Sequence, residues 1–186
     1  LISDKKFDEL EKKLFSLKPK SDYFKQKLVL PSIEKDTIEN FITGLDKDED
    51  IVVEPKIDGC AVAIEYRDGI LHKAITRKGK DITRKMTNVH SVPLSVPTKD
   101  TIQIRGELYT KDVAGNVSQR IAAGYLRSKS FIPNVNLKFC AFQIINAEIN
   151  QWDALDLLKK MGFKRHNCSL VPAYSLKESY KEWFRN

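Results

Sequence analysis

The alternation of apolar and polar residues changes its period along the chain, and these changes predict where helices and strands lie. Between Phe7 and Leu17, apolar residues recur every three or four positions, which is typical of one face of a helix. Pro19 is expected to end this helix. A second helix is predicted from Asp36, which forms a capping-box pattern with Glu39.

From Ile51 the period shortens to two, which favours strands. Strands are predicted at residues 51–56, 60–66, 70–76, 101–109 and 138–146. The second and third of these are separated by Arg67-Asp68-Gly69, a strong signal for a hairpin turn. Residues 78–88 are basic and polar, and we expect a loop with some helix there.

Three further helices are predicted in the second half of the chain. The first carries its apolar face at Val113, Val117 and Ile121. Gly124 is expected to cap it, and a helix over residues 152–161 follows. Ser175 and Glu178 form a capping box that opens a last helix through Phe184. Because hairpins rather than crossovers join the strands, the pattern predicts an α+β fold with a mostly antiparallel sheet.

Composition adds a preference for anionic partners. The 186 residues include 32 Lys and Arg against 25 Asp and Glu, a net charge of +7. Such an excess favours a polyanionic partner, although a solvated basic surface is the alternative. The apolar runs are far shorter than the roughly 20 residues that a membrane span needs, so we expect a soluble protein with no membrane partner.

The cysteines and histidines do not form a recognisable metal site. The cysteines are Cys60, Cys140 and Cys168, and the histidines are His72, His90 and His166. There is no Cys-x-x-Cys pair, which excludes a zinc ribbon and makes a disulfide framework unfavourable. This usage fits a reducing cytoplasm. The histidines lack ligand spacing, and we expect surface or half-buried positions for them rather than catalytic ones.

The most informative chemistry lies at the end of the first predicted strand. Lys56 and Asp58 are two residues apart, so on a strand their side chains would point to the same side. A neutral lysine amine is a nucleophile, and a neighbouring carboxylate would orient it or hold a metal ion. On spacing alone, an ordinary ion pair of Lys56 with Asp58 or Glu54 is an alternative reading.

The segment Lys56-Ile57-Asp58-Gly59 resembles the Lys-x-Asp-Gly signature of covalent nucleotidyltransferases, namely DNA ligases, RNA ligases and mRNA capping enzymes. The order of the later segments is similar to that of NAD-dependent DNA ligases. The similar segments are residues 74–77, 79–83, 92–94, 104–109, 122–127 and 157–163. Residues 2–10 also resemble a helical segment that grips the nicotinamide half of NAD and that ATP-dependent ligases lack.

The resemblance implies a nucleotidyltransferase (ATP-grasp-like ligase) fold and a role for each matching residue. Lys56 would be the nucleophile that takes AMP from NAD, and Asp58 and Glu107 would face the nucleotide or a Mg²⁺ ion. The expected cofactor-binding residues are Glu54, Arg77, Glu107, Ser32 and Ile33 near the nucleotide, and Asp4, Phe7 and Asp8 near the nicotinamide. The expected phosphate contacts to nicked double-stranded DNA are Arg127, Lys78, Lys80 and Arg84, within a basic surface that also includes Lys73, Arg77 and Lys85.

The resemblance also implies a division of the chain. Residues 1–20 would be the remnant of the nicotinamide-recognition domain, and residues 21–186 an adenylation domain that lacks its last strands. A second ligase subunit, or a missing C-terminal part, would supply the remaining motifs and an oligonucleotide-binding fold. The expected location is the cytoplasm of a bacterium or of a phage-infected host cell.

The sequence departs from the family pattern at particular residues, and two other functions stay open. Phe7 stands in place of a tyrosine, and Gln119-Arg120 in place of Arg-Asn, which puts one phosphate contact in doubt. One alternative is a nucleotidyltransferase that uses ATP or GTP, such as an RNA ligase or a capping enzyme. The other is a non-catalytic basic module that binds nucleic acid.

Overall fold

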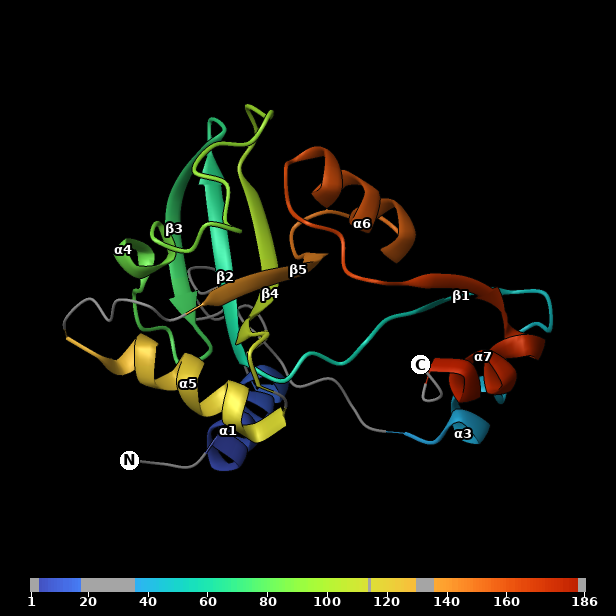
Figure 1. The fold of residues 1–186 in the computed structure, drawn as a ribbon. Helices are drawn as coiled ribbons and strands as arrows, with labels where there is room; N and C mark the ends of the chain where they lie inside the picture. Colours follow the sequence, from blue (N-terminus) through green and yellow to red (C-terminus); the bar gives the residue numbers. More distant parts are fainter. Residues whose placement is uncertain (1–3, 18–35, 114, 130–135, 184–186) are drawn as a thin grey trace.

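The computed structural model describes residues 4–17, 36–113, 115–129 and 136–183 (Figure 1). Its helices are α1 (Asp4–Leu17), α3 (Ile38–Ile42), α4 (Thr83–Met86), α5 (Gly115–Arg127), α6 (Gln151–Lys160) and α7 (Leu176–Trp183), with a 3₁₀ turn, η1 (Ala173–Ser175), before α7. Its strands are β1 (Asp50–Val53), β2 (Cys60–Arg67), β3 (Ile70–Thr76), β4 (Ile102–Thr110), β5 (Leu137–Ile144) and β6 (Ser169–Pro172).

Four strands form the central sheet in the order β3-β2-β4-β5, and each neighbouring pair is antiparallel. Asp68 and Gly69 connect β2 to β3, with φ angles of 49° and 76°. Two successive residues at positive φ match the twist of a tight hairpin, and aspartate and glycine tolerate this conformation best. The predicted α+β fold, the hairpin and the antiparallel sheet are therefore confirmed.

β4 separates the hydrophobic core from the face that carries the polar residues. Its residues alternate between buried and half-buried from Ile102 to Thr110. Gly106 lies on the core side, where a Cβ atom would come within 2.3 Å of the Phe139 ring. Gln103, Arg105 and Glu107 of β4 therefore point to the opposite face, whereas Thr110 is buried.

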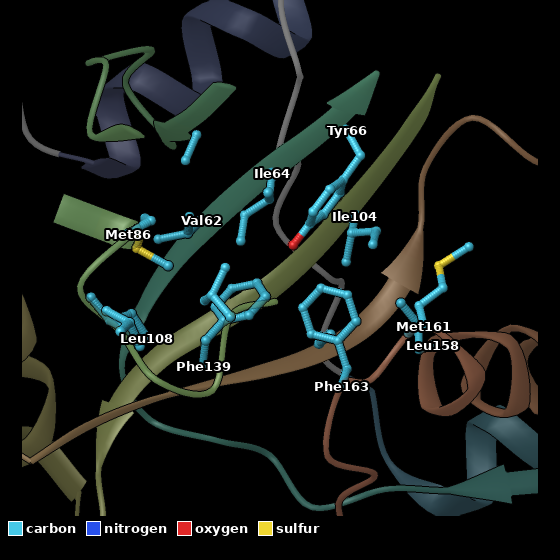
Figure 2. Close-up of a cluster of buried hydrophobic side chains, with 14 of the residues drawn as sticks. Val62, Ile64, Tyr66, Met86, Ile104, Leu108, Phe139, Leu158, Met161 and Phe163 are labelled. Atoms are coloured by element: carbon cyan, nitrogen blue, oxygen red, sulfur yellow. The ribbon is translucent and has the colours of Figure 1, made fainter. Parts of the chain in front are cut away.

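Aromatic and aliphatic side chains fill the core on one side of this sheet (Figure 2). Tyr66 is fully buried, and its hydroxyl donates a hydrogen bond to the Pro93 carbonyl at 2.7 Å. The ring of Phe163 meets the rings of Tyr66 and Phe139 edge-on, at centroid distances of 6.2 and 6.1 Å. Phe163 follows α6, so these contacts fix α6 and the segment after it against the sheet.

A second, two-stranded sheet pairs β1 with β6, from Asp50 opposite Pro172 to Val53 opposite Ser169. Helices α3 and α7 lie beside it. They are joined by an ion pair in which Nζ of Lys177 on α7 is 3.1 Å from Oε1 of Glu39 on α3. Figure 1 shows this part set apart from the central sheet, with the chain after β1 leading back to the start of β2. The segment after Val53 thus bridges the two sheets.

The strand predictions need correction at β1 and β6. The strand expected over residues 51–56 ends at Val53, because Pro55 has no N–H to continue a ladder. The strand β6 was not predicted, since it has only four residues and ends in a proline. Its pairing with β1 joins residues more than a hundred positions apart, which no local pattern reveals.

Two predicted helix caps were wrong. Thr37, not Asp36, caps α3, because its hydroxyl accepts the Asn40 N–H at 3.2 Å. Gly124 lies inside α5, which continues to Arg127. Helix α7 begins at Leu176, directly after Ser175, and the Ser175 hydroxyl donates to the Pro172 carbonyl at 3.0 Å.

The apolar face predicted for α5 was only partly right. Val113 lies before the helix and Val117 is 48% exposed, whereas Ile121 packs against the core. The helix instead buries Ser118, Ala122 and Tyr125. Ser118 anchors it, because its hydroxyl accepts the Thr110 N–H at 3.1 Å. Within the described residues, no helix is long and apolar enough to cross a bilayer.

Candidate active site

Lys56 and Asp58 lie in the segment that bridges the two sheets, between β1 and β2. The Nζ atom of Lys56 is 2.5 Å from Oδ1 of Asp58, and the two side chains are 80% and 48% exposed. The residues are close as predicted, but a loop rather than strand alternation brings them together. An exposed amine beside a carboxylate is available to a substrate in solution.

Gly59 holds this segment against β4. A Cβ atom at Gly59 would lie 2.2 Å from the carbonyl oxygen of Leu108, so only glycine allows the approach. The Gly59 N–H donates a hydrogen bond to the carboxyl group of Glu107. This contact connects the Lys56–Asp58 pair to the polar face of the central sheet.

Glu107 is the most perturbed acid of this region. Burial raises its pKa to about 7, and the Asp58 carboxylate acts in the same direction. Arg105, the Gly59 N–H and Lys56 oppose the shift. Burial also lowers the pKa of Arg105. The Glu107 carboxylate acts to raise this pKa, and the Arg77 guanidinium acts to lower it. Glu107 therefore lies among cations but has too little solvent to ionise as readily as an exposed glutamate.

Glu54, at the start of the bridging segment, is held by two side chains. Its Oε1 atom is 2.6 Å from Nε2 of His166, and its Oε2 atom accepts a hydrogen bond from Gln151 at 2.8 Å. The other ring nitrogen of His166, Nδ1, lies 3.3 Å from Sγ of Cys140. The contacts with Cys140 and Glu54 raise the pKa of His166 to about 10, against a smaller effect of burial.

The family of the chain follows from comparison with known proteins. The family described as NAD-dependent DNA ligase adenylation domain matches residues 9–185. The chain belongs to this family. The match includes the bridging segment, Glu107 on β4 and the helices α3 and α7.

Curated members of the ligase family are similar over most of the chain. The DNA ligase of Borrelia hermsii is 36% identical over 152 aligned residues, in a match that covers 71% of this chain and 22% of that protein. The DNA ligase of Borreliella burgdorferi is 32% identical over 170 aligned residues, in a match that covers 79% of this chain and 25% of that protein. The chain thus spans about a quarter or less of the length of these relatives.

A solved structure shares the fold. An archaeal ATP-dependent RNA ligase matches 84% of this chain and 41% of its own chain, with a TM-score of 0.57 and 19% identity. At this identity the likeness concerns the fold alone. This likeness in fold agrees with the nucleotidyltransferase fold that the sequence resemblance implied.

The predicted phosphate-binding residues of this family member lie on another part of the surface. Arg84 and Lys85 of α4 line a pocket of about 680 Å³, together with Tyr125 of α5 and Lys129. Lys85 lies over the Tyr125 ring, 4.8 Å from its centroid.

The other basic residues of this prediction lie on the neighbouring elements. Lys80 donates to the Leu126 carbonyl at 3.2 Å, and Arg127 is the exposed last residue of α5. Lys78 is exposed in the loop after β3. Arg77, by contrast, is half-buried and close enough to Arg105 to affect its pKa.

Five of the predicted cofactor-binding residues have side chains outside the described part of the structure. Ser32 and Ile33 lie outside the described residues. Asp4, Phe7 and Asp8 belong to α1, whose backbone is described, but their side chains lie outside the described part. Within the described residues, no group of three or more His, Cys, Asp or Glu could hold a metal ion. Asp58 and Glu107 supply two carboxylates near Lys56.

Sequence reasoning missed the two side chains that hold Glu54. His166 is half-buried, as expected, but its contact with a residue 112 positions earlier has no local signature. Gln151 also donates to the Phe142 carbonyl at 2.6 Å, which ties α6 to β5 and Glu54 together. Cys140 lies on the same face of the sheet as Glu107, because the two residues are partners between β5 and β4, and this register cannot be read from the sequence alone.

Proposed function

We propose that this chain is the adenylation part of an NAD-dependent DNA ligase, with nicked double-stranded DNA as the final substrate. The observation that carries the proposal is the exposed Lys56 amine, 2.5 Å from Asp58, in a chain of the NAD-dependent adenylation family. In this reading, the Lys56–Asp58 ion pair is the resting state of a nucleophile.

The first step transfers an adenylyl group to Lys56. The Nζ atom of Lys56 attacks the phosphorus of the AMP half of NAD and forms an N–P bond. The P–O bond to the nicotinamide mononucleotide breaks, and this mononucleotide leaves with the bonding electrons. The proton lost by the amine passes to solvent, with Asp58 as the nearest acceptor. The adenylyl group then passes to a 5′-phosphate at a nick, and a 3′-hydroxyl displaces AMP.

Other residues bind the nucleotide in this proposal. Glu54 lies beside the adenine, and its two oxygens are fixed by His166 and Gln151. Arg77 and Glu107 face the sugar and the phosphate from the polar side of the central sheet. Further contacts to the nucleotide and to the nicotinamide half come from Ser32, Ile33, Asp4, Phe7 and Asp8.

A Mg²⁺ ion fits the carboxylates near Lys56. Magnesium in nucleotide sites is held by one or two carboxylates, several waters and substrate phosphates. Asp58 and Glu107 match this requirement, and a cation would favour the ionised form of Glu107 that burial disfavours. The ion would supply positive charge where charge develops on the phosphate.

The DNA contacts are assigned to the basic surface around α4 and the end of α5. Its pocket is lined by Arg84, Lys85 and Lys129, and Lys78, Lys80 and Arg127 extend the positive charge. Such cations bind the phosphate backbone without regard to sequence. This suits an enzyme that seals nicks wherever they occur.

A second ligase subunit or further domains, including an oligonucleotide-binding fold, would act with this chain. We divide the chain into residues 1–20, a remnant of the nicotinamide-recognition domain, and residues 21–186, the adenylation domain. Within the described residues, β1 and β6 pair only with each other. Strand edges of this kind are ready to pair with added strands.

The test of the proposed function is the intact mass of the chain after incubation with Mg²⁺ and either NAD or ATP. We expect the mass of one adenylyl group to be added with NAD and not with ATP. Addition with ATP alone would indicate an ATP-dependent nucleotidyltransferase instead. Addition with neither nucleotide would favour a non-catalytic nucleic-acid-binding module.

Replacement of His166 by glutamine should weaken NAD binding and stability together. Because the contacts with Cys140 and Glu54 raise the pKa of His166 to about 10 from an ordinary 6.5, the protonated ring stabilises the fold fully below pH 6.5, and this stabilisation is lost as pH rises towards 10. We expect a loss of about 2 kcal/mol in unfolding free energy at pH 6.5, which shrinks towards pH 10. The NAD concentration for half-maximal labelling should rise about tenfold.

Denaturant titrations at several pH values, and labelling at varied NAD concentrations, measure these effects. The matched control is His72→Gln, an exposed residue of β3, which should change neither quantity. A stability loss of His166→Gln that does not depend on pH, or an unaltered NAD dependence, would contradict the role of His166.

A further inference from the structure

We propose that a cationic pocket behind the Lys56 segment, distinct from the basic surface around α4, binds backbone phosphates of DNA. The pocket has a volume of about 630 Å³. Pro55 and Ile57, the two neighbours of Lys56, line it, as do residues of the β4 and β5 ends and of the segment after α6. No residue is shared with the pocket between α4 and α5.

The charged residues that line this pocket are all basic. Lys111 follows β4, Lys138 lies on β5, and Lys164 follows α6, so three separate parts of the chain each bring one ammonium group. Arg165, His90 and His166 line the pocket too, His166 as the partner of Glu54, and no aspartate or glutamate does. Such a set of cations in a concave site concentrates anions.

Most of this charge is not neutralised by neighbours. Arg165 is already bound to Asp156 and lies over the Trp152 ring, 4.2 Å from its centroid. Lys111, Lys138 and Lys164 form no ion pair within the described part of the chain. Three lysines therefore remain for a ligand.

A phosphodiester backbone matches this arrangement better than a single free phosphate. The lysines stand on three different segments, and a nucleic acid strand offers a separate negative charge at each nucleotide. Lysine also binds phosphate as a point charge without demanding one orientation. Because Pro55 and Ile57 form part of the wall, DNA held here would lie next to the proposed nucleophile. The identity of the anion as DNA rests on the proposed ligase function.

The experiment compares two triple variants that remove the same charge. The pocket variant carries Lys111→Gln, Lys138→Gln and Lys164→Gln. The control carries Lys47→Gln, Lys99→Gln and Lys181→Gln, all exposed and outside both pockets. Binding to a fluorescently labelled nicked duplex is measured by anisotropy between about 50 and 200 mM salt, a range in which phosphate contacts dominate the affinity.

We expect the pocket variant to bind DNA about tenfold more weakly or worse, and the slope of log K against log salt to fall by about 2 to 3. The control variant should retain a higher DNA affinity and a steeper salt dependence than the pocket variant. Equal losses in the two variants, or no DNA binding by the wild-type chain, would overturn the proposal. If titration with AMP shows a loss in the pocket variant while DNA binding is unchanged, the ligand is a free nucleotide and the DNA assignment is wrong.

The readout also separates this inference from the proposed function. NAD-dependent labelling of Lys56 should be the same in the pocket variant as in the wild type. Absence of labelling in the wild type would contradict the proposed function, while the difference in DNA binding between the two variants would still decide the role of the pocket.

Discussion

Replacement of Lys56 by alanine is expected to abolish covalent labelling by NAD that carries a labelled adenylate. The reason is chemical, since alanine removes the Nζ atom that would form the bond to phosphorus. Stability should change by less than about 0.5 kcal/mol, because the Lys56 side chain is 80% exposed and exposed ion pairs contribute little. The measurement is labelled protein on a denaturing gel, together with a denaturant titration of the same samples.

Two further variants make the Lys56 experiment specific. Lys56→Arg keeps the positive charge and the contact with Asp58 but should be inactive, because a guanidinium does not lose its proton near neutral pH. Lys99→Ala, an exposed lysine far from the bridging segment in sequence, should label like the wild type. Undiminished labelling of Lys56→Ala would refute the assignment of the nucleophile, and the ordinary ion pair would then be the better reading.

The parts of the fold that sequence predicts well are those set by neighbouring residues. The Asp68–Gly69 turn needs positive φ at both residues, and the alternation along β4 directly reflects which side chains are buried. The same local reasoning failed for α5. Val113 lies before the helix, and Val117 within it is exposed, since the hydrogen bond between Ser118 and Thr110 decides which face meets the sheet.

The candidate site divides in the same way. The proximity of Lys56 and Asp58 was predicted from their spacing on a strand, although the structure brings them together in a loop. By contrast, Glu107 meets Gly59, and Glu54 meets His166, only because the chain folds back over many residues. Motif order indicated Glu54 and Glu107, but nothing pointed to His166. Contacts between distant segments depend on the whole packing arrangement, which single-sequence patterns do not carry.

The second large effect is expected from Gly59→Ala, which tests whether the approach of the bridging segment to β4 matters for chemistry. The added Cβ atom would lie 2.2 Å from the Leu108 carbonyl oxygen and 3.0 Å from Cγ of Glu107. The first is a backbone atom that cannot rotate away, so the segment must shift and the hydrogen bond from Gly59 to Glu107 is strained or lost.

We expect Gly59→Ala to lower the rate of NAD-dependent labelling by about a hundredfold, because misplacement of reacting groups by about 1 Å has effects of this size. The unfolding free energy should fall by about 1 to 3 kcal/mol, the usual cost of overpacking. Single-turnover labelling and denaturant titration measure the two effects separately, so a loss of activity in a folded protein can be recognised.

The matched control for Gly59→Ala is Gly124→Ala, the same substitution at a glycine inside α5. A Cβ atom there meets nothing within 4 Å, and alanine is the better helix former. This variant should label like the wild type and gain up to about 1 kcal/mol in stability. If Gly59→Ala behaved like Gly124→Ala, the bridging segment would have room to spare, and its contact with β4 would not position Lys56.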